Sequence, residues 1–315
     1  MAAITKYLRF GEESAFGQET NDYAETVDPT TASLDPAGDD KLILEGIGGL
    51  DRVAGLGVYS TAGDIGIPLD DASTGWFWKW TLGGYEVSGT TGSYTHTFTP
   101  QLGGLMTPFS AAVGKDQFEH VFTGNVITEL SLEADSEWAA LSVSVIGSRD
   151  LRASLVDEVD YTEGRMFTAP EGRLVSGQTD LSADINSVSL AISTGADVET
   201  SAGFGSRFPT KATRGSMEVA LELSLAFDNM DELTRFWGDT TGPSTDHIAE
   251  ESYTLSFGDA IDIVIPRTVA TSAGQPADGR GTITQSVSLR GMYSEATKSG
   301  PVEVHLTNTR ESYSV

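Results

Sequence analysis

Residues 118–147 read FEHVFTGNVITELSLEADSEWAALSVSVIG, and their alternation of apolar and polar side chains decides the fold. Such alternation, with a period of two, is typical of strands with one buried and one wetter face. The small and polar residues 134–137 predict a tight turn, so the stretch reads as a β-hairpin. The apolar faces of its two strands are Val126, Thr128, Leu130 and Leu132, followed by Ala139, Leu141, Val143 and Val145.

A similar hairpin recurs near the C-terminus and indicates a duplicated module. Gly124–Leu132 (GNVITELSL) aligns with Gly281–Leu289 (GTITQSVSL) at an offset of 157 residues. Trp80 and Trp237 each close a short expected helix, and they align at the same offset of 157. Two matches at one offset predict two tandem copies of one folding unit.

The sequence therefore predicts a mainly β chain with two tandem related β-sandwich or half-barrel modules, each with a short flanking α-helix. The Gly- and Thr-rich segments 84–92 and 194–213 are expected to be loops. The expected domains are an N-terminal arm (1–40), module 1 (41–150), a connector (151–182) and module 2 (183–315).

The charge balance is strongly acidic, with 19 Lys and Arg against 46 Asp and Glu and a formal net charge of −27. Such a surface repels nucleic acid, because phosphate contacts need Lys and Arg. The acid excess serves solubility or indicates adaptation to high salt, where screening shortens to ~3 Å at molar ionic strength. Only 6 of the basic residues are Lys, which favours a halophilic source.

No pattern in the sequence points to catalysis, so no enzyme activity, cofactor or metal is expected. There is no Cys, no G-x-S-x-G turn and no H-E-x-x-H, and the four His lie far apart in the sequence. His96, on the aromatic face of a Thr-alternating strand, is expected to be a packed neutral His. Carboxylate pairs for glycoside hydrolysis stay open, since only geometry decides them.

The start of the chain has no apolar secretory segment, and no apolar run approaches the ~18 residues of a spanning helix. We therefore expect a soluble chain made in a cytoplasm, with no membrane partner. A pilus-like or secreted β-sandwich adhesin of a halophilic archaeon is the alternative. The missing signal and the missing N-x-Ser/Thr sequons argue against it, and the missing signal also argues against a secreted carbohydrate-active enzyme.

The order of elements resembles the tail tube proteins of long-tailed phages and archaeal tailed viruses. The residues that carry the resemblance are the Gly-bracketed start Phe10–Gly17 (FGEESAFG), the short aromatic helix, the YTHTF strand and Gly124–Leu132. The second hairpin turn, at Lys298–Pro301, departs from the pattern. The resemblance implies a β-sandwich whose subunits close into rings, with hairpins joined edge to edge into one inner barrel and rings stacked into a hollow tube.

The resemblance also implies a virion tail location, synthesis in the host cytoplasm and a set of partners. These are further copies of the chain, a tape-measure protein in the lumen, tail terminator and baseplate proteins, and DNA that passes without specific binding. Two modules per chain predict a trimeric ring with pseudo-six-fold symmetry. The arm is expected to order on a neighbouring subunit, and its aromatic residues are candidates for contacts between rings: Tyr7, Phe10, Phe16 and Tyr23. Polar residues on the outer faces of the hairpins are candidates for lining the lumen: Glu129, Ser131, Glu133, Ser142, Ser144, Ser286, Ser288, Glu303 and His305.

Overall fold

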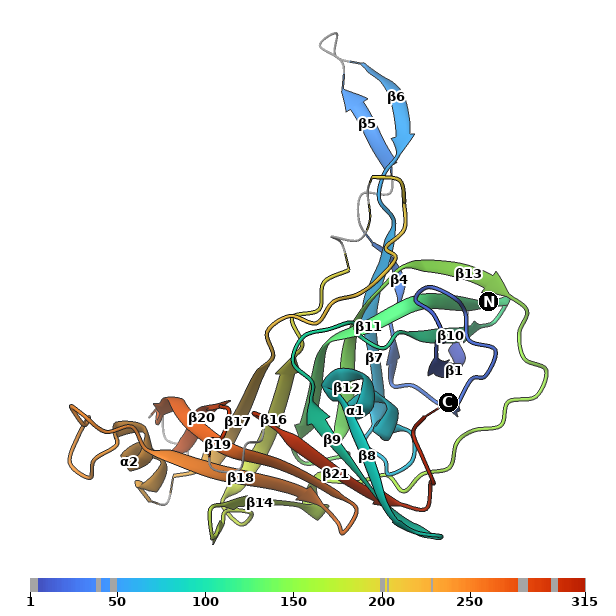
Figure 1. Ribbon diagram of the computed structural model, residues 1–315. Helices are drawn as coiled ribbons and strands as arrows, with labels where there is room; N and C mark the ends of the chain where they lie inside the picture. The colour runs from blue at the N-terminus through green and yellow to red at the C-terminus, as the bar shows by residue number, and fades with distance from the viewer. Residues whose placement is uncertain are drawn as a thin grey trace.

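The computed structural model describes residues 5–37, 41–45, 50–198, 202, 204–227, 229–276, 283–295 and 300–314. The fold is mainly β, as the alternation predicts, and its strand pairs are antiparallel (Figure 1). The first half contains β1 (Thr5–Glu12), β2 (Glu25–Val27), β3 (Thr31–Ala32), β4 (Asp35–Ala37), β5 (Lys41–Glu45), β6 (Asp51–Leu56), β7 (Ser60–Pro68), α1 (Thr74–Leu82), β8 (Gly83–Thr90), β9 (Ser93–Pro100), β10 (Phe109–Lys115), β11 (Phe118–Ala134), β12 (Ala140–Gly147) and β13 (Arg149–Ala153).

The second half begins after a long irregular connection and ends close to the C-terminus. It contains a 3₁₀ turn η1 (Ala169–Glu171), β14 (Gly172–Ser176), β15 (Thr179–Asp180), β16 (Ile185–Ser193), β17 (Glu218–Ala226), α2 (Asp231–Trp237), β18 (Glu250–Phe257), β19 (Ile261–Gly274), β20 (Thr284–Gly291) and β21 (Glu303–Asn308).

One sheet runs through both halves, and we call it the central sheet. Its strands lie in the order β4, β7, β12, β11, β16, β17, β20, β19, with β3 continuing β4 along β7. Two long strands leave this sheet at one end. The first part of β11 pairs with β10 and β13, and the first part of β19 pairs with β18 and β21. Each half therefore has a second layer attached through one long bent strand.

The strand pairings of the first half recur in the second half. The pairs β1–β10, β10–β11, β11–β12 and β12–β7 correspond to β14–β18, β18–β19, β19–β20 and β20–β17. Helix α1 follows β7 as α2 follows β17, and β13 pairs with β11 as β21 pairs with β19. A hairpin without a counterpart, β8–β9, is inserted in the first half after α1. The duplication inferred from the sequence thus appears as a repeated topology.

The sequence alignment of the second hairpin is wrong in register. It equates β11 with β20, whereas the pairings equate β12 with β20 and β11 with β19. The offset of 157 holds for the starts of α1 and α2, at Thr74 and Asp231. It fails beyond the helix because the inserted β8–β9 hairpin shifts the numbering. This hairpin also replaces the expected loop at 84–92, and Gly281 lies outside the described residues.

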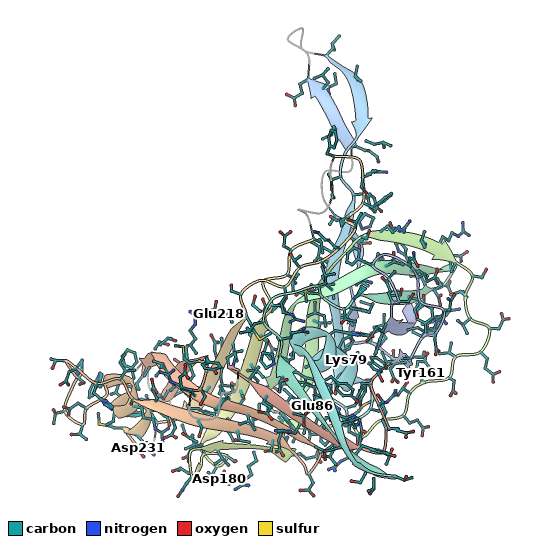
Figure 2. All side chains as sticks on the ribbon, viewed as in Figure 1. Lys79, Glu86, Tyr161, Asp180, Glu218 and Asp231 are labelled. Carbon is teal, nitrogen blue, oxygen red and sulfur yellow. The ribbon has the colours of Figure 1, made fainter. Side chains whose placement is uncertain are left out.

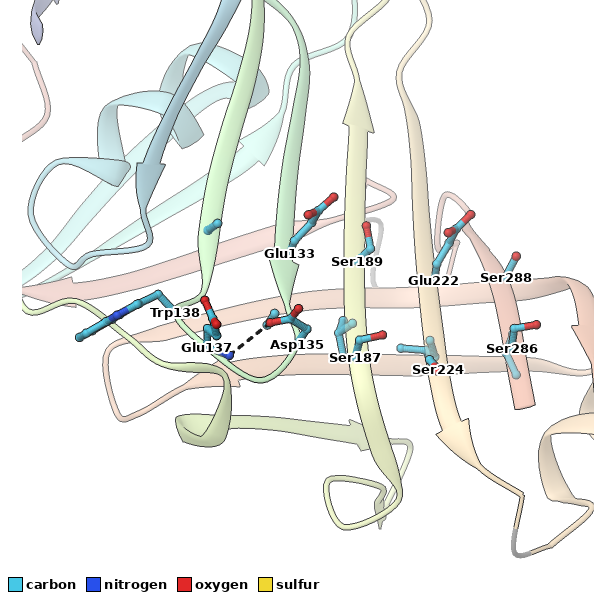
Figure 3. Close-up of a pocket in the computed structure, with 15 residues that line it drawn as sticks. Glu133, Asp135, Glu137, Trp138, Ser187, Ser189, Glu222, Ser224, Ser286 and Ser288 are labelled. Atoms are coloured by element: carbon cyan, nitrogen blue, oxygen red, sulfur yellow. Dashed lines mark hydrogen bonds between the residues drawn. The ribbon is translucent and has the colours of Figure 1, made fainter. Parts of the chain in front are cut away.

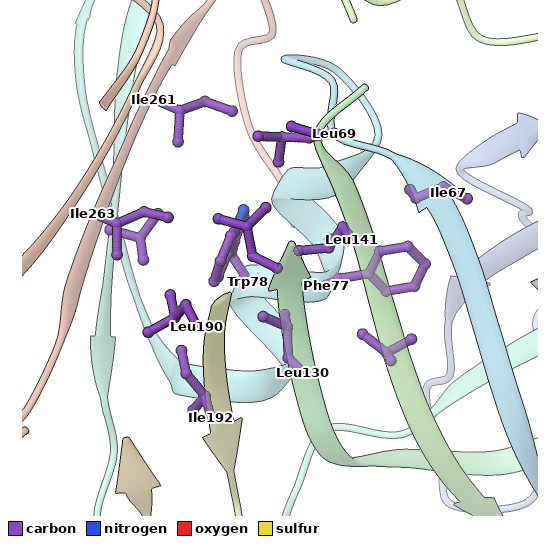
Figure 4. Packing of buried hydrophobic residues seen from close by; sticks show 14 of the residues in the cluster. Ile67, Leu69, Phe77, Trp78, Leu130, Leu141, Leu190, Ile192, Ile261 and Ile263 are labelled. Carbon is purple, nitrogen blue, oxygen red and sulfur yellow. The ribbon is translucent and has the colours of Figure 1, made fainter. Parts of the chain in front are cut away.

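The hydrophobic core lies between the apolar face of the central sheet and α1 (Figure 4). Four aromatic side chains of α1 are at most 2 % exposed: Trp76, Phe77, Trp78 and Trp80. The Trp80 ring stacks on Phe109 with centroids 4.3 Å apart, and Gly75 lets the Tyr313 ring lie against the helix. Helix α2 has the equivalent place in the topology but buries only Glu232. The two helices correspond in position and differ in packing.

The expected N-terminal arm needs correction, because residues 5–12 form β1 within the fold. Tyr7 and Phe10 are 1 % and 0 % exposed, and the Tyr7 hydroxyl donates to Glu119 Oε2 at 2.8 Å. Phe16 lies beside Gly124, and the Arg9 guanidinium lies 4.1 Å from the Tyr23 ring centroid. All four aromatic residues therefore contact their own chain. Their density in the sequence reflects a core strand and its cover.

Candidate functional site

The polar face of the central sheet is the candidate functional surface. In the central sheet, which β11 joins with its last part, strand alternation places the larger apolar side chains of β11, β12, β16, β17 and β20 in the core and their Ser and Glu residues on the other face. Seven of the predicted lumen residues lie on this face: Glu129, Ser131, Glu133, Ser142, Ser144, Ser286 and Ser288.

Glu303 and His305 lie elsewhere, in β21 of the second layer. His305 Nδ1 lies 3.2 Å from the hydroxyl of Thr97, and His305 Nε2 lies 3.2 Å from Glu303 Oε1. The sequence predicts that residues 283–289 and 302–306 form one hairpin, and this prediction is wrong. Strand β20 pairs with β17 and β19, whereas β21 pairs with β19 and β9. In the pairing pattern β21 corresponds to β13, which also lies in a second layer.

The sequence-based list omits two central strands that carry much of this face. Strands β16 and β17 form the middle of the sheet, and the alternation of Ser and Glu along them was the available signal. The residues that they add are Ser187, Ser189, Ser193, Glu218, Glu222 and Ser224. Asp64 of β7 extends the face on the other side, where it accepts a hydrogen bond of 2.7 Å from the Ser144 hydroxyl.

Acidic and hydroxyl side chains are interleaved on this surface. Glu129 lies opposite Ser144 and Ser193, and Glu222 lies opposite Ser189 and Ser288. Directly opposed like charges destabilise a sheet, and this interleaving avoids them. Arg290 contributes a cation and forms a 3.1 Å ion pair with Glu218, a residue labelled in Figure 2. The face therefore carries acidic or hydroxyl side chains on every strand from β7 to β20.

A shallow trough of about 500 Å³ crosses one end of this face (Figure 3). One row across its floor contains Glu133, Ser189, Glu222 and Ser288, which come from four neighbouring strands. The turn between β11 and β12 forms its rim, where the Trp138 side chain is 56 % exposed. Among the described residues no group of three or more His, Asp or Glu is arranged to hold a metal ion.

His96 is buried away from this surface, between the aromatic rings of Tyr85 and Tyr313. Its Nδ1 lies 2.9 Å from the Tyr85 hydroxyl, and its Nε2 lies 3.0 Å from Asn308 Oδ1. Burial lowers the pKa of His96, so the packed neutral His expected from the sequence agrees with this environment.

A second exposed surface lies on the hairpin β5–β6, which projects from one end of the molecule (Figure 1). Beside the exposed charged residues Lys41, Glu45 and Asp51, it exposes a group of apolar side chains: Leu42, Ile43, Leu44, Leu50, Val53 and Leu56. The segment 204–208 lies at its base, where the backbone N–H of Tyr59 donates to Arg207 O at 2.9 Å. Exposed apolar groups of this extent mark a contact surface.

Comparison with known families gives a match that covers most of the chain. Residues 4–291 match the family described as phage tail tube protein. The chain belongs to the phage tail tube protein family. A comparison with curated proteins finds no match. The family resemblance drawn from the sequence is confirmed. This tail tube protein is a structural component of the virion tail that assembles with copies of itself and with other tail components. Within the described residues, no helix is long and apolar enough to cross a membrane.

Proposed function

We propose that three copies of this tail tube protein close into a ring and that the polar face of the central sheet lines its hole. The observation that supports this proposal is the repeated pairing pattern, since each chain then supplies two equivalent modules to a pseudo-six-fold ring. We place the start of the first module at β1 and that of the second at β14, since β1 pairs with β10 as β14 pairs with β18.

The chemistry of the sheet face suits a conduit for DNA. A wall that carries Glu129, Glu133 and Glu222 between serines repels phosphate groups and offers no cationic row to hold them. DNA would pass along such a wall without binding to it. Before ejection, a tape-measure protein would occupy the same hole, and terminator and baseplate proteins would cap the tube.

The hairpin β5–β6 suits contacts between stacked rings. It projects beyond the sheet and exposes Leu42 and Leu44 at 55 % and 66 %, which favours burial against another subunit. The corresponding connection in the second module, between β16 and β17, instead packs at the base of this hairpin. A three-chain ring would therefore carry three hairpins.

Electron microscopy of the purified protein in molar salt tests the proposal. We expect hollow tubes whose rings contain three chains, each seen as two similar lobes. Rings of six chains would refute the pseudo-six-fold arrangement. A protein that stays monomeric at high concentration in molar salt would refute the tube and favour the adhesin alternative.

A further inference from the structure

The contact between the two modules of one chain is a strand pair within the central sheet. The last part of β11 pairs with β16, so that Leu130 lies opposite Ile192 and Leu132 opposite Leu190. All four side chains are at most 1 % exposed. The Thr194 backbone N–H donates to Thr128 O at 2.9 Å at the edge of this contact. The chain thus contains one complete example of a junction between modules.

The repeated topology identifies the strands that would form the same junction between two chains. Strand β19 corresponds to β11, and β4 corresponds to β16, because β4 pairs with β7 as β16 pairs with β17. Both of these strands lie at the edges of the central sheet. In the described part of the chain, Ser272–Gly274 of β19 pairs only with β20, and Asp35–Ala37 of β4 pairs only with β7.

A β-bulge at the same place in β11 and in β19 shows which residues of the two strands correspond. Pairing with the neighbouring strand shifts around Thr128 in β11 and around Thr271 in β19. The Thr128 hydroxyl donates to Ser144 O at 3.0 Å, and the Thr271 hydroxyl donates to Ser288 O at 3.0 Å. Thr271 is therefore the counterpart of Thr128, and Ser272 is the counterpart of Glu129.

The neighbouring strands carry this register across to β4. Ser144 lies opposite Asp64, and Ser288 lies opposite Glu222, so Asp64 corresponds to Glu222. On the far side, the partner of Asp64 is Ser33, whose backbone N–H donates to Asp64 O at 2.9 Å. The partner of Glu222 on the corresponding side is Ser189. Ser33 therefore corresponds to Ser189. Ala37 lies four residues after Ser33, and Ser193 lies four residues after Ser189, so Ala37 is the counterpart of Ser193.

We propose that Ser272–Gly274 of one chain pairs antiparallel with Asp35–Ala37 of the next chain, with Ser272 opposite Ala37 as Glu129 is opposite Ser193 within the chain. The partner is a second copy of this protein, and the inference rests on the ring proposed above. Unpaired edges of this kind favour pairing with another strand. Pro36 offers no N–H, so this junction contains fewer hydrogen bonds than the one within the chain.

The absence of native Cys makes disulfide trapping a clean test. The Cα atoms of opposed residues in antiparallel strands lie about 4.5–5.5 Å apart, within the range that a disulfide spans. After assembly in molar salt and mild oxidation, the double variant S272C/A37C should give covalent species of two and three chains on a denaturing gel. The matched control E129C/S193C should form its disulfide within one chain and give no larger species.

A second pair of variants tests the register. S272C/S33C moves one partner four residues along the same edge and should leave the chains unlinked under the same conditions. Mixing the single variants S272C and A37C should give covalent dimers. This mixture tests the same contact if the double variant fails to assemble. Rings that form without the S272C–A37C bond, or with the S272C–S33C bond instead, would overturn the proposed pairing and leave the ring intact. Wild-type protein that forms no rings would overturn both proposals.

Discussion

At the scale of single residues, Glu13 explains why two short motifs far apart in the sequence belong together. Its carboxylate accepts hydrogen bonds of 2.8 Å from the backbone N–H groups of Gly17 and Gly124 and from the Ser110 hydroxyl. Gly17 and Gly124 have φ of 74° and 69°, a region that favours glycine. The sequence shows the glycines and the acid, but only the fold brings residues 13 and 124 together. Their pairing could not be predicted from spacing.

The pKa of Glu13 makes it a source of pH-dependent stability. Burial raises this pKa from its usual 4.5 to about 7, against the opposing effect of its hydrogen bonds. Because the folded-state pKa is raised, the stabilising contribution is complete below pH 4.5 and is lost as the pH rises through about 7. We expect the wild type to lose roughly 3 kcal/mol over this window that Glu13→Gln does not lose.

The measurement is the free energy of unfolding by denaturant at pH 5 and pH 8, at one fixed salt concentration. Glu25 and Asp70 also have raised pKa values from burial, and they titrate in both proteins. The difference between wild type and variant therefore isolates Glu13. Parallel pH profiles for the two proteins would show that Glu13 keeps its charge when folded.

At the scale of elements, predictability follows the strength of the local pattern. Alternation in the sequence identifies β11, β12, β16 and β17, because each has one face in the core. It misses β8, which carries Gly83, Gly84 and Gly89 and, in the described part of the chain, pairs on one side only, with β9. Helix α1 is predictable from its aromatic cluster. The register of the repeat is not, because the inserted β8–β9 hairpin leaves no mark in a short alignment.

The apolar surface of β5–β6 leads to a prediction about stacking. Replacing Leu42 and Leu44 with Ser removes apolar area that would be buried between rings, where a buried Leu contributes about 1.5–3 kcal/mol. We expect rings to form as in the wild type and tubes to become short or absent. Tube length in electron micrographs and sedimentation of the assemblies measure the effect.

A matched control is Val87→Ser, which changes an exposed apolar residue of β8 that is 43 % exposed and lies away from the hairpin. Tube length should be unchanged in this control. If L42S/L44S tubes reach wild-type length, the hairpin does not hold the rings together, and another surface must do so.

At the scale of the whole molecule, the sequence predicts the class of fold and the duplication, and it predicts the polar face from strand alternation. It places Glu303 and His305 on the wrong layer, because long-range pairing decides which sheet a strand joins. It also cannot show that the two modules share one continuous central sheet. That continuity depends on the contact between β11 and β16, which lie far apart in the chain.

The net charge of −27 per chain leads to a prediction about assembly and salt. Chains of like charge repel one another as they close a ring, and this repulsion reaches about 10 Å at 0.1 M salt and about 3 Å at 1 M. We therefore propose that the source is halophilic and expect tubes in molar KCl and separate chains at about 0.1 M. Light scattering and electron microscopy across a KCl series measure the transition.

Some salts also strengthen the burial of apolar surface, so the effect of charge screening needs a separate control. Sucrose is excluded from protein surfaces and favours burial without screening charge. If repulsion between acidic chains sets the transition, sucrose at low salt should leave the chains separate, while KCl and NaCl at equal ionic strength should assemble them equally. Assembly in sucrose alone would mean that burial of apolar surface, including that of β5–β6, outweighs the charge. The acid excess would then serve solubility, the other role open to it from the sequence.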